Sequence, residues 1–210
     1  MLQNNLVRLT GRAVEEPRLS HMATGESIYS VKIETERLSG QYDVIPVQIP
    51  ESLLPPDELA GKTIRVTGEF HSRNRSDESG SHLILSVFAR ELELYDGPVA
   101  CSDNNMIRLN GFLCKAPVFR VTPRGREIAD LLLAVNRSYG RPDYLPCIVW
   151  GNVAKEAGSL SVGAPVTVEG RIQSRQYIKW LSETECEERT AYEVSGSRIG
   201  TWEQDVEAVG

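Results

Sequence analysis

The sequence predicts an all-β chain made of two tandem copies of one small five-stranded barrel. Its clearest feature is a duplication, because residues 104–111 (NNMIRLNG) repeat residues 4–11 (NNLVRLTG) at a spacing of one hundred residues. The spacing persists, with a two-residue slip in the second half of the repeat, and pairs Pro17 with Pro117, Arg37 with Arg137, Asp43 with Asp143, Gly68 with Gly170 and Ser72 with Ser174. A period this long exceeds the roughly 20 to 50 residues of solenoid repeats and suits a whole small domain.

Each copy contains five segments with the composition of β-strands. These segments are rich in β-branched and aromatic residues and are bounded by Gly, Pro and Ser. They cover residues 6–14, 27–36, 43–49, 63–72 and 82–93 in the first copy, and residues 107–114, 128–135, 144–150, 166–177 and 189–199 in the second. Glycines recur where so small a barrel needs bends or bulges, at Gly11, Gly68, Gly111 and Gly170.

A short helix is expected between the third and fourth strands of each copy. In the second copy Asn152 is a suitable N-terminal cap, helix-forming residues follow it, and Gly158 is a suitable end. Five strands with a helix between the third and the fourth are the plan of the OB-fold, a Greek-key barrel that binds oligonucleotides and oligosaccharides. We therefore expect a first OB-fold at residues 1–97, a second at residues 103–200 and a short acidic tail at residues 201–210.

Length and composition indicate two compact domains of ordinary size. The chain has 210 residues, of which 40% are hydrophobic and 25% are charged, and this fits two domains of about 100 residues each. Its apolar runs are far shorter than the roughly 20 residues of a membrane-spanning helix, and residues 1–9 lack the apolar core of a secretory signal. These features predict a cytoplasmic protein without a membrane partner.

Charge is distributed unevenly between the two copies. The whole chain has a net charge of −6, which by itself argues against a nucleic-acid partner. Residues 104–181, however, hold eleven Lys or Arg against five acidic residues, whereas residues 4–75 hold nine against ten. The second copy therefore has the positive charge expected of a phosphate-binding surface. The acidic residues that follow it indicate a solvated hairpin tip, with a counter-charge to the basic region as the alternative: Glu183, Glu185, Glu187 and Glu188.

The residues that support catalysis or metal binding form no recognisable motif in the sequence. All three histidines lie in the first copy without a paired cysteine or carboxylate motif, and the sequence has neither a phosphate-binding glycine loop nor a GxSxG turn. The four cysteines have no CxxC spacing, which predicts reduced thiols rather than a zinc site or disulfides: Cys101, Cys114, Cys147 and Cys186. We therefore expect no enzyme activity, no catalytic residue, no metal and no cofactor.

Four segments of the second copy carry a family resemblance. They read NMIRLNGFLCKAP at residues 105–117, LAVNR at 133–137, CIVWG at 147–151 and VEGRIQSR at 168–175. In this order and spacing they resemble the bacterial single-stranded DNA-binding protein family, and the resemblance covers about residues 104–200. The first copy resembles the family more weakly, chiefly through Leu9, Gly11, Pro17 and residues 66–73.

The resemblance implies that single strands bind by stacking of bases on aromatic side chains and by pairing of phosphates with cations. It places the stacking aromatics at Tyr139, Tyr144, Trp150 and Tyr177. Phosphate contacts are expected from cations of the same copy, namely Arg108, Lys115, Arg124, Arg126, Arg137, Arg141, Arg171, Arg175 and Lys179. We expect the first copy to bind a strand weakly or not at all and to serve an architectural or oligomerising role, because its residues at the stacking positions are Ser39, Val44, Pro50 and Arg75.

The predicted function is sequence-nonspecific binding of single-stranded DNA in replication, recombination or repair, by a nucleoid-associated protein. A homodimer is expected because it would supply the four barrels that members of the family commonly assemble, and single-stranded RNA remains an open alternative ligand. Recruitment of replication or repair proteins is in doubt, because the acidic residues 202–210 lack the Pro-Phe tip of the family. The rival hypothesis is an OB-fold adaptor of the primosome or conjugation type that mainly contacts proteins and binds nucleic acid secondarily.

Overall fold

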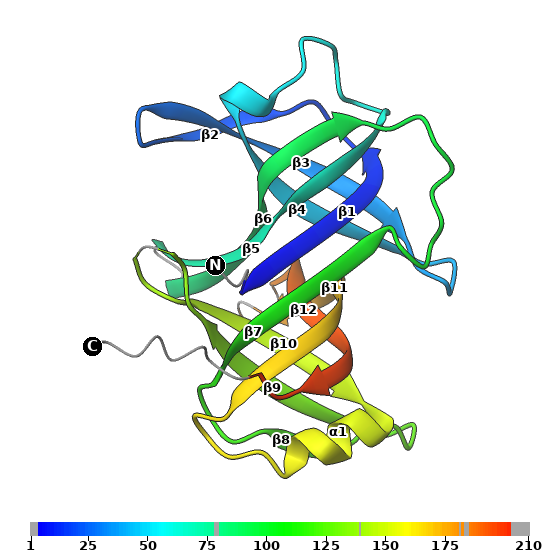
Figure 1. Cartoon of the computed structure of the whole chain (residues 1–210), viewed down its shortest axis with the longest axis vertical. Coiled ribbons are helices and arrows are strands. Elements are labelled where there is room, and N and C mark those ends of the chain that lie inside the picture. The colour runs from blue at the N-terminus through cyan, green and yellow to red at the C-terminus, as the bar shows by residue number, and fades with distance from the viewer. Residues whose placement is uncertain (1–3, 78–79, 139, 181, 183–184, 203–210) are drawn as a thin grey trace, which may run out of the picture.

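The computed structural model describes residues 4–77, 80–138, 140–180, 182 and 185–202. Within them lie twelve strands, one α-helix and one 3-10 helix (Figure 1). The first repeat contains β1 (Asn5–Ala13), β2 (Arg18–Ala23), β3 (Glu26–Glu36), β4 (Tyr42–Pro50), η1 (Glu51–Leu53), β5 (Thr63–Asp77) and β6 (Gly80–Leu94). The second contains β7 (Asn105–Leu113), β8 (Val118–Val121), β9 (Glu127–Val135), β10 (Asp143–Trp150), α1 (Gly151–Gly158), β11 (Pro165–Trp180) and β12 (Cys186–Gly200).

Each repeat closes five strands into a ring. In the first repeat β1 pairs with β5, β5 with β6, β6 with β4 and β4 with β3, which returns to β1. The same ring in the second repeat runs through β7, β11, β12, β10 and β9 and back to β7. The short strands β2 and β8 add to β3 and β9. The chain is therefore mostly β, as the sequence predicts, in a strand order consistent with an OB-fold.

Side chains alternate along the strands, so that apolar ones fill the interior of each ring and the residues between them lie on its outer face. On β10, Leu145 and Val149 are buried inside the second ring, whereas Tyr144 and Trp150 are exposed. On β4 the inward residues are buried in the same way, at Ile45, Val47 and Ile49. Because the side chains of a strand point alternately to its two faces, this pattern decides which residues a ligand outside each ring can reach.

Two of the four predicted glycine bends are bulges between paired strands. Gly68 on β5 and Gly170 on β11 each lie at a shift in register with the neighbouring strand. A Cβ atom at either position would lie 2.1 Å from a backbone oxygen, that of Phe88 or that of Ser195. Only glycine permits so close an approach, and a bulge there increases the local twist of the hairpin.

The connection between the third and fourth ring strands differs between the repeats. The second repeat has α1, whereas the first has only the three-residue η1 where we expected a helix. Leu54 follows η1, and Pro55 and Pro56 come next. Proline has no amide hydrogen to donate and disfavours helical conformation in the residue before it. The expectation of a short helix in both copies is therefore wrong for the first.

The strands β2 and β8 were also not predicted. All four side chains of β8 are exposed, and most of those of β2 are exposed too. Such short strands bury too little apolar surface to show the alternation that marks the longer ones.

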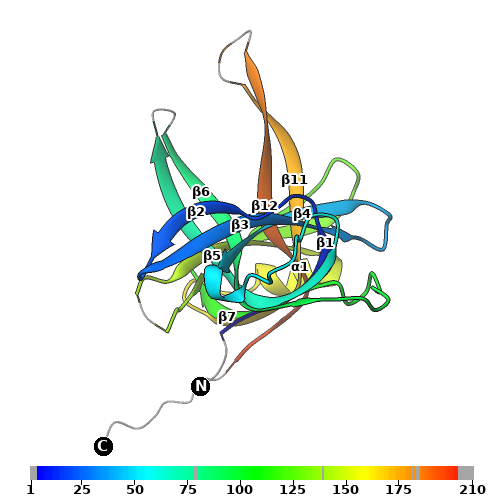
Figure 2. The ribbon, with the colours of Figure 1, turned by 90° about the horizontal axis from the view of Figure 1, so that it is seen from above.

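The two rings share one continuous sheet, because β1 and β7 lie side by side at the centre of the molecule (Figure 1). The pairing is antiparallel, with Asn5 opposite Leu109 and Leu9 opposite Asn105. This reciprocity relates the repeats by an approximate two-fold axis. The long hairpins β5–β6 and β11–β12 project from the same side of the molecule (Figure 2).

The start of the predicted acidic tail packs against the second ring. The ring of Trp202 lies 5.4 Å from that of Phe112, and its Nε1 donates to the carbonyl oxygen of Gly111 at 3.2 Å. Residues 203–210, the rest of the predicted tail, lie outside the described residues. No helix in the described part of the chain is long and apolar enough to cross a membrane.

Candidate nucleic-acid interface

The outer face of β10 carries two of the predicted stacking aromatics. Tyr144 and Trp150 lie six residues apart on this strand, so both point away from the ring interior. Their exposed fractions are 49% and 36%. Pro146 and Ile148 lie between them on the same face. Pro146 is half-buried and Ile148 is buried, so the exposed part of this apolar strip is the aromatic ring at each end.

Trp150 is held in a defined orientation at the end of β10. Its Nε1 donates to Oγ of Ser195 at 3.3 Å. Ser195 lies on β12 and pairs with Ile148 of β10, so the indole extends across the neighbouring strand. The next residue, Gly151, has a φ of +58°, which lets the chain turn from β10 into α1. A hydrogen bond at one edge of the indole fixes the ring and leaves its plane for stacking.

The same outer face continues onto the hairpin of β11 and β12. Arg171 of β11 lies opposite Ser195, and by alternation Arg175 and Tyr177 share its face. The exposed fraction of Tyr177 is 37%, and Lys179 follows two residues later on that face. Tyr177 therefore has a cationic side chain on either side of it along the strand.

The other aromatics predicted or found near this surface are Tyr139 and Trp180. Tyr139, the fourth predicted stacking residue, lies outside the described residues. Ile178 and Trp180 alternate with Tyr177 on β11, so they occupy the other face of the hairpin, and both are largely exposed. Sequence reasoning gave them no role, although three large side chains within four residues of a predicted strand were a visible signal.

The predicted phosphate contacts fall into different surroundings. Arg108 lies on β7, which does not neighbour β10 in the ring, and its Nε is 3.6 Å from Glu169. Lys179 is half-buried on the hairpin. Two others, Arg137 and Arg171, belong to contacts between the repeats that are described next. Arg108 is exposed, and so are the remaining cations, Lys115, Arg124, Arg126, Arg141 and Arg175.

A buried aspartate of the first repeat ties it to the second. Asp43 exposes 1% of its side chain and accepts hydrogen bonds from Arg37 of its own repeat. It also accepts one from Nη1 of Arg171 at 2.7 Å and one from the backbone nitrogen of Ser174 at 2.6 Å. The bonds to Asp43 raise the pKa of Arg37, whereas burial lowers the pKa of Arg171. We call these four residues the Asp43 junction.

The matching aspartate of the second repeat makes the reciprocal contact. Asp143 exposes 1% of its side chain and accepts hydrogen bonds from Nε of Arg137 at 2.7 Å and from the backbone nitrogen of Ser72. Nδ1 of His71 lies 3.4 Å from Oδ2 of Asp143, as Nη1 of Arg171 contacts Oδ2 of Asp43. Burial lowers the pKa of His71, and the bonds to Asp143 raise the pKa of Arg137. These residues form the Asp143 junction, which has one permanently charged cation fewer.

Comparison with known proteins identifies the second repeat. Residues 104–201 match the model of the Single-strand binding protein family. The second repeat is thus similar to members of this family. Over 80 residues it is 39% identical to "Single-stranded DNA-binding protein 2" of Listeria innocua, covering 35% of this chain and 50% of that protein. Over 80 residues it is 38% identical to the "Single-stranded DNA-binding protein" of Halalkalibacterium halodurans, covering 35% and 48%. The chain spans about half the length of the curated relatives it matches.

Solved structures of a single-stranded DNA binding protein from Thermus aquaticus share the fold of both repeats. The wild-type structure gives a TM-score of 0.73 at 22% identity and covers 98% of this chain and 96% of that one. A deletion mutant gives a TM-score of 0.72 at 23% identity and covers 98% of both chains. The likeness of fold therefore extends to the first repeat, which lies outside the match of the family model.

The first repeat has a different set of side chains on its outer face. Pro50, at the position of Trp150, is buried. Phe88 of β6 is half-buried, with the guanidinium of Arg90 5.0 Å from its ring centre and the ring of His71 5.9 Å away. Sequence reasoning missed Phe88 because it examined only the positions aligned with the four expected aromatics.

Proposed function

We propose that the chain binds single-stranded DNA without sequence preference, over the outer face of β10, β12 and β11. The observation that carries this proposal is the common face of Tyr144, Trp150 and Tyr177, all of them exposed. Every base has a π-face, so stacking on such rings is tolerant of sequence and contributes about 1 to 3 kcal/mol per base. The names of the curated relatives support single-stranded DNA as the ligand.

Cations beside these aromatics supply the phosphate contacts of the proposal. Arg175 and Lys179 flank Tyr177 along β11, and Arg141 precedes β10. Arg124 and Arg126 lie on the turn between β8 and β9. Arg137 and Arg171, engaged with aspartates at the junctions, contribute in this proposal chiefly by holding the two repeats together. In this proposal the DNA strand therefore contacts exposed cations and not all of the cations predicted from the sequence.

We further propose that the two rings are OB-folds, at residues 1–97 and 103–200, and that the chain forms a homodimer. The closed ring of strands in each repeat and the likeness to the Thermus aquaticus fold support the first part. The homodimer is the expectation drawn from the family resemblance. Sedimentation velocity of the full chain measures it, and a species with the mass of one chain, 23.3 kDa, over a wide concentration range would contradict it.

The test is fluorescence titration with Trp150 as the only tryptophan. The other two, Trp180 and Trp202, are replaced by Phe, and oligo-dT is added at several salt concentrations. We expect quenching, and a slope of log K against log salt of about −0.7 for each phosphate neutralised. Titration with oligo-rU in parallel compares RNA with DNA.

Single substitutions in the same titration test the aromatic surface. Trp150→Ala and Tyr144→Ala should each weaken binding by about 1 to 3 kcal/mol. The matched control is Tyr42→Ala, an exposed tyrosine of the first repeat that lines a pocket with Val99. A chain that binds no oligo-dT, or whose binding is indifferent to both substitutions and to salt, contradicts the proposal and favours the adaptor hypothesis.

A further inference from the structure

Phe88 and Ser195 occupy equivalent places in the two rings. Phe88 lies opposite Gln48 in the parallel pairing of β4 and β6. Ser195 lies opposite Ile148 in the parallel pairing of β10 and β12, and Ile148 is one hundred residues after Gln48. The bulge glycines of β5 and β11 agree with this. A Cβ atom at either would lie 2.1 Å from the carbonyl oxygen of Phe88 or of Ser195.

Both rings present an aromatic side chain at this place, but from different strands. In the second ring Trp150 of β10 reaches across to Ser195 through the hydrogen bond at 3.3 Å. In the first ring the residue at the position of Trp150 is the buried Pro50, so β4 offers no aromatic there. Phe88 supplies one from β6 itself. The aromatic of the first ring is thus moved to the neighbouring strand rather than lost.

The surroundings of Phe88 have the chemistry to hold one nucleotide. The guanidinium of Arg90 lies 5.0 Å from the ring centre, and the ring of His71 meets that of Phe88 at 70°. Glu69 lies 2.8 Å from Arg90 and 3.0 Å from His71, so its charge is paired. Bases stack on aromatic rings and on guanidinium planes, and arginine also pairs with phosphate.

The surface of the second ring reaches this group through the Asp143 junction. The backbone nitrogen of Tyr144 donates to Oγ of Ser72 on β5 at 2.9 Å. Asp143, the residue before it, is 3.4 Å from His71. His71 in turn contacts Phe88. A ligand that runs along β10 toward Tyr144 would therefore pass the Asp143 junction and reach β5 and β6 of the first ring.

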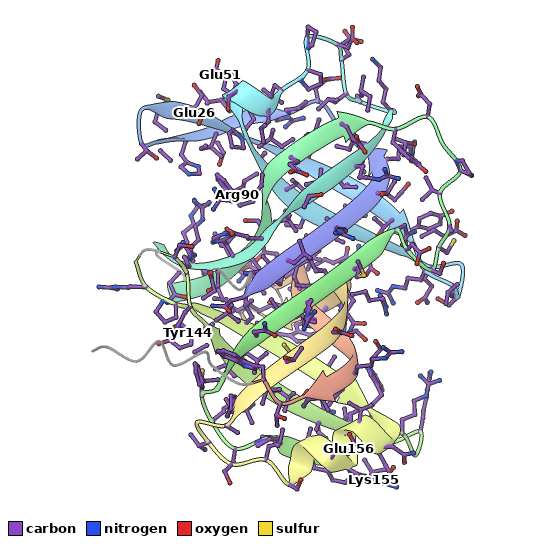
Figure 3. The ribbon with its side chains drawn as sticks, viewed as in Figure 1. Glu26, Glu51, Arg90, Tyr144, Lys155 and Glu156 are labelled. Carbon is purple, nitrogen blue, oxygen red and sulfur yellow. The ribbon has the colours of Figure 1, made fainter. Side chains whose placement is uncertain are left out.

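We propose that Phe88, Arg90 and His71 form a second nucleotide-binding site. It binds the same single-stranded DNA molecule that Trp150 and Tyr144 bind. Figure 3 shows Arg90 and Tyr144 on the same flank of the molecule, one following the other along its long axis. The ligand is a further nucleotide of the same single strand, stacked by its base on Phe88. This inference rests on the proposed function and extends it from the second ring to the first.

The test compares two strand lengths on the full chain. An OB-fold takes about 4 to 16 nucleotides, so an oligo-dT of about 10 occupies the second ring and one of about 30 reaches the first. We expect Phe88→Ala to weaken binding of the longer strand by about fivefold or more, and binding of the shorter strand by less than about twofold. Tyr42→Ala, the matched control, should leave both affinities unchanged.

A second variant keeps the proposal testable should Phe88→Ala fail to fold. Phe88→Trp is introduced into a chain whose three tryptophans are replaced by Phe, so that the new indole reports on this place alone. We expect quenching by the longer strand and not by the shorter. Absence of quenching by the longer strand, or equal affinity of Phe88→Ala and the unaltered chain for it, overturns the inference. If the unaltered chain binds neither strand, the proposed function fails as well.

Discussion

The two repeats pair their strands in the same order and differ in which strands carry the aromatic side chains of the proposed sites. The second ring sets Trp150 on β10, whereas the first sets Phe88 on β6 and fills the position of Trp150 with a buried proline. The two junctions also differ in one side chain: Arg171 contacts Asp43, whereas His71 contacts Asp143. Inward side chains are close-packed and tolerate little change, whereas outer ones are free to diverge. A shared fold therefore shows where a ligand can lie and not which strand contacts it.

The largest expected effect contrasts the two junctions in folding stability. Asp43→Ala leaves Arg37 and Arg171 without their shared partner, and removal of one member of a buried charge pair costs about 3 to 5 kcal/mol. Asp143→Ala leaves one arginine and a histidine whose pKa burial lowers, so the loss should be smaller. Urea denaturation of the full chain measures both.

A surface pair is the control for the junction variants. Arg12 and Glu34 are 2.9 Å apart, but both side chains are partly exposed, so Glu34→Ala should cost less than about 1 kcal/mol. Equal losses for Asp43→Ala and Asp143→Ala would show that the two junctions are energetically equivalent in spite of their different cations.

The next effect contrasts Tyr177 with Arg75, which is its counterpart in the first repeat after the two-residue slip. Tyr177→Ala should weaken binding of oligo-dT by about 1 to 3 kcal/mol if one base stacks there. Arg75→Ala removes no aromatic ring and should change the affinity far less. Equilibrium titration of both variants decides the matter, and a larger effect at Arg75 would reverse the roles assigned to the two hairpins.

A finer contrast concerns the paired cations Arg175 and Arg73. We expect Arg175→Gln to reduce the magnitude of the salt slope by about 0.7, the value for one phosphate contact on a single strand. Arg73→Gln should reduce it less, because the net charge of residues 4–75 is −1 whereas that of residues 104–181 is +6. Slopes that change equally for the two variants would indicate that both hairpins contact phosphates to the same extent.

The sequence was sufficient for what depends on local pattern. Strand periodicity predicted the ring strands, because inward residues such as Val149 alternate with outward ones such as Trp150. The helix expected in the first repeat is wrong, because that expectation rested on the second repeat. Pro55 and Pro56, which disfavour a helix there, have no counterpart in α1. Short exposed strands such as β8 have no periodic signal to detect.

The candidate site was predicted only in part, because its missing members depend on contacts between distant strands. The position of Phe88 beside β4 follows from a parallel pairing that links residues forty apart in sequence. The junctions join residues more than sixty apart in sequence. The recurrence of Asp43 as Asp143 and of Ser72 as Ser174 is visible in the sequence and indicates these contacts. Repeat pairs that are polar and lie on strands are therefore candidates for contacts between repeats.

The smallest expected effect contrasts His71 with Gln173, its counterpart in the second repeat. Burial is the main cause that lowers the pKa of His71, with Arg137 acting in the same direction, and it outweighs Asp143 and Glu69, which raise it. As the pH falls through about 6.5, the usual pKa of a histidine, the unfolded chain takes up a proton that the folded chain resists. Folding stability contributed by a neutral His71 is therefore present above this pH and is lost below it.

His71→Gln removes this titration while giving the first repeat the residue that the second already has. We expect the melting temperature of the unaltered chain to fall more between about pH 7.5 and pH 5.5 than that of His71→Gln. The variant His21→Gln, on β2 and away from both junctions, should behave like the unaltered chain. An identical fall for His71→Gln and the unaltered chain would show that Asp143 and Glu69 already balance the burial of the imidazole. The two junctions would then respond alike to pH, and the difference between the repeats would be confined to their ligand-binding faces.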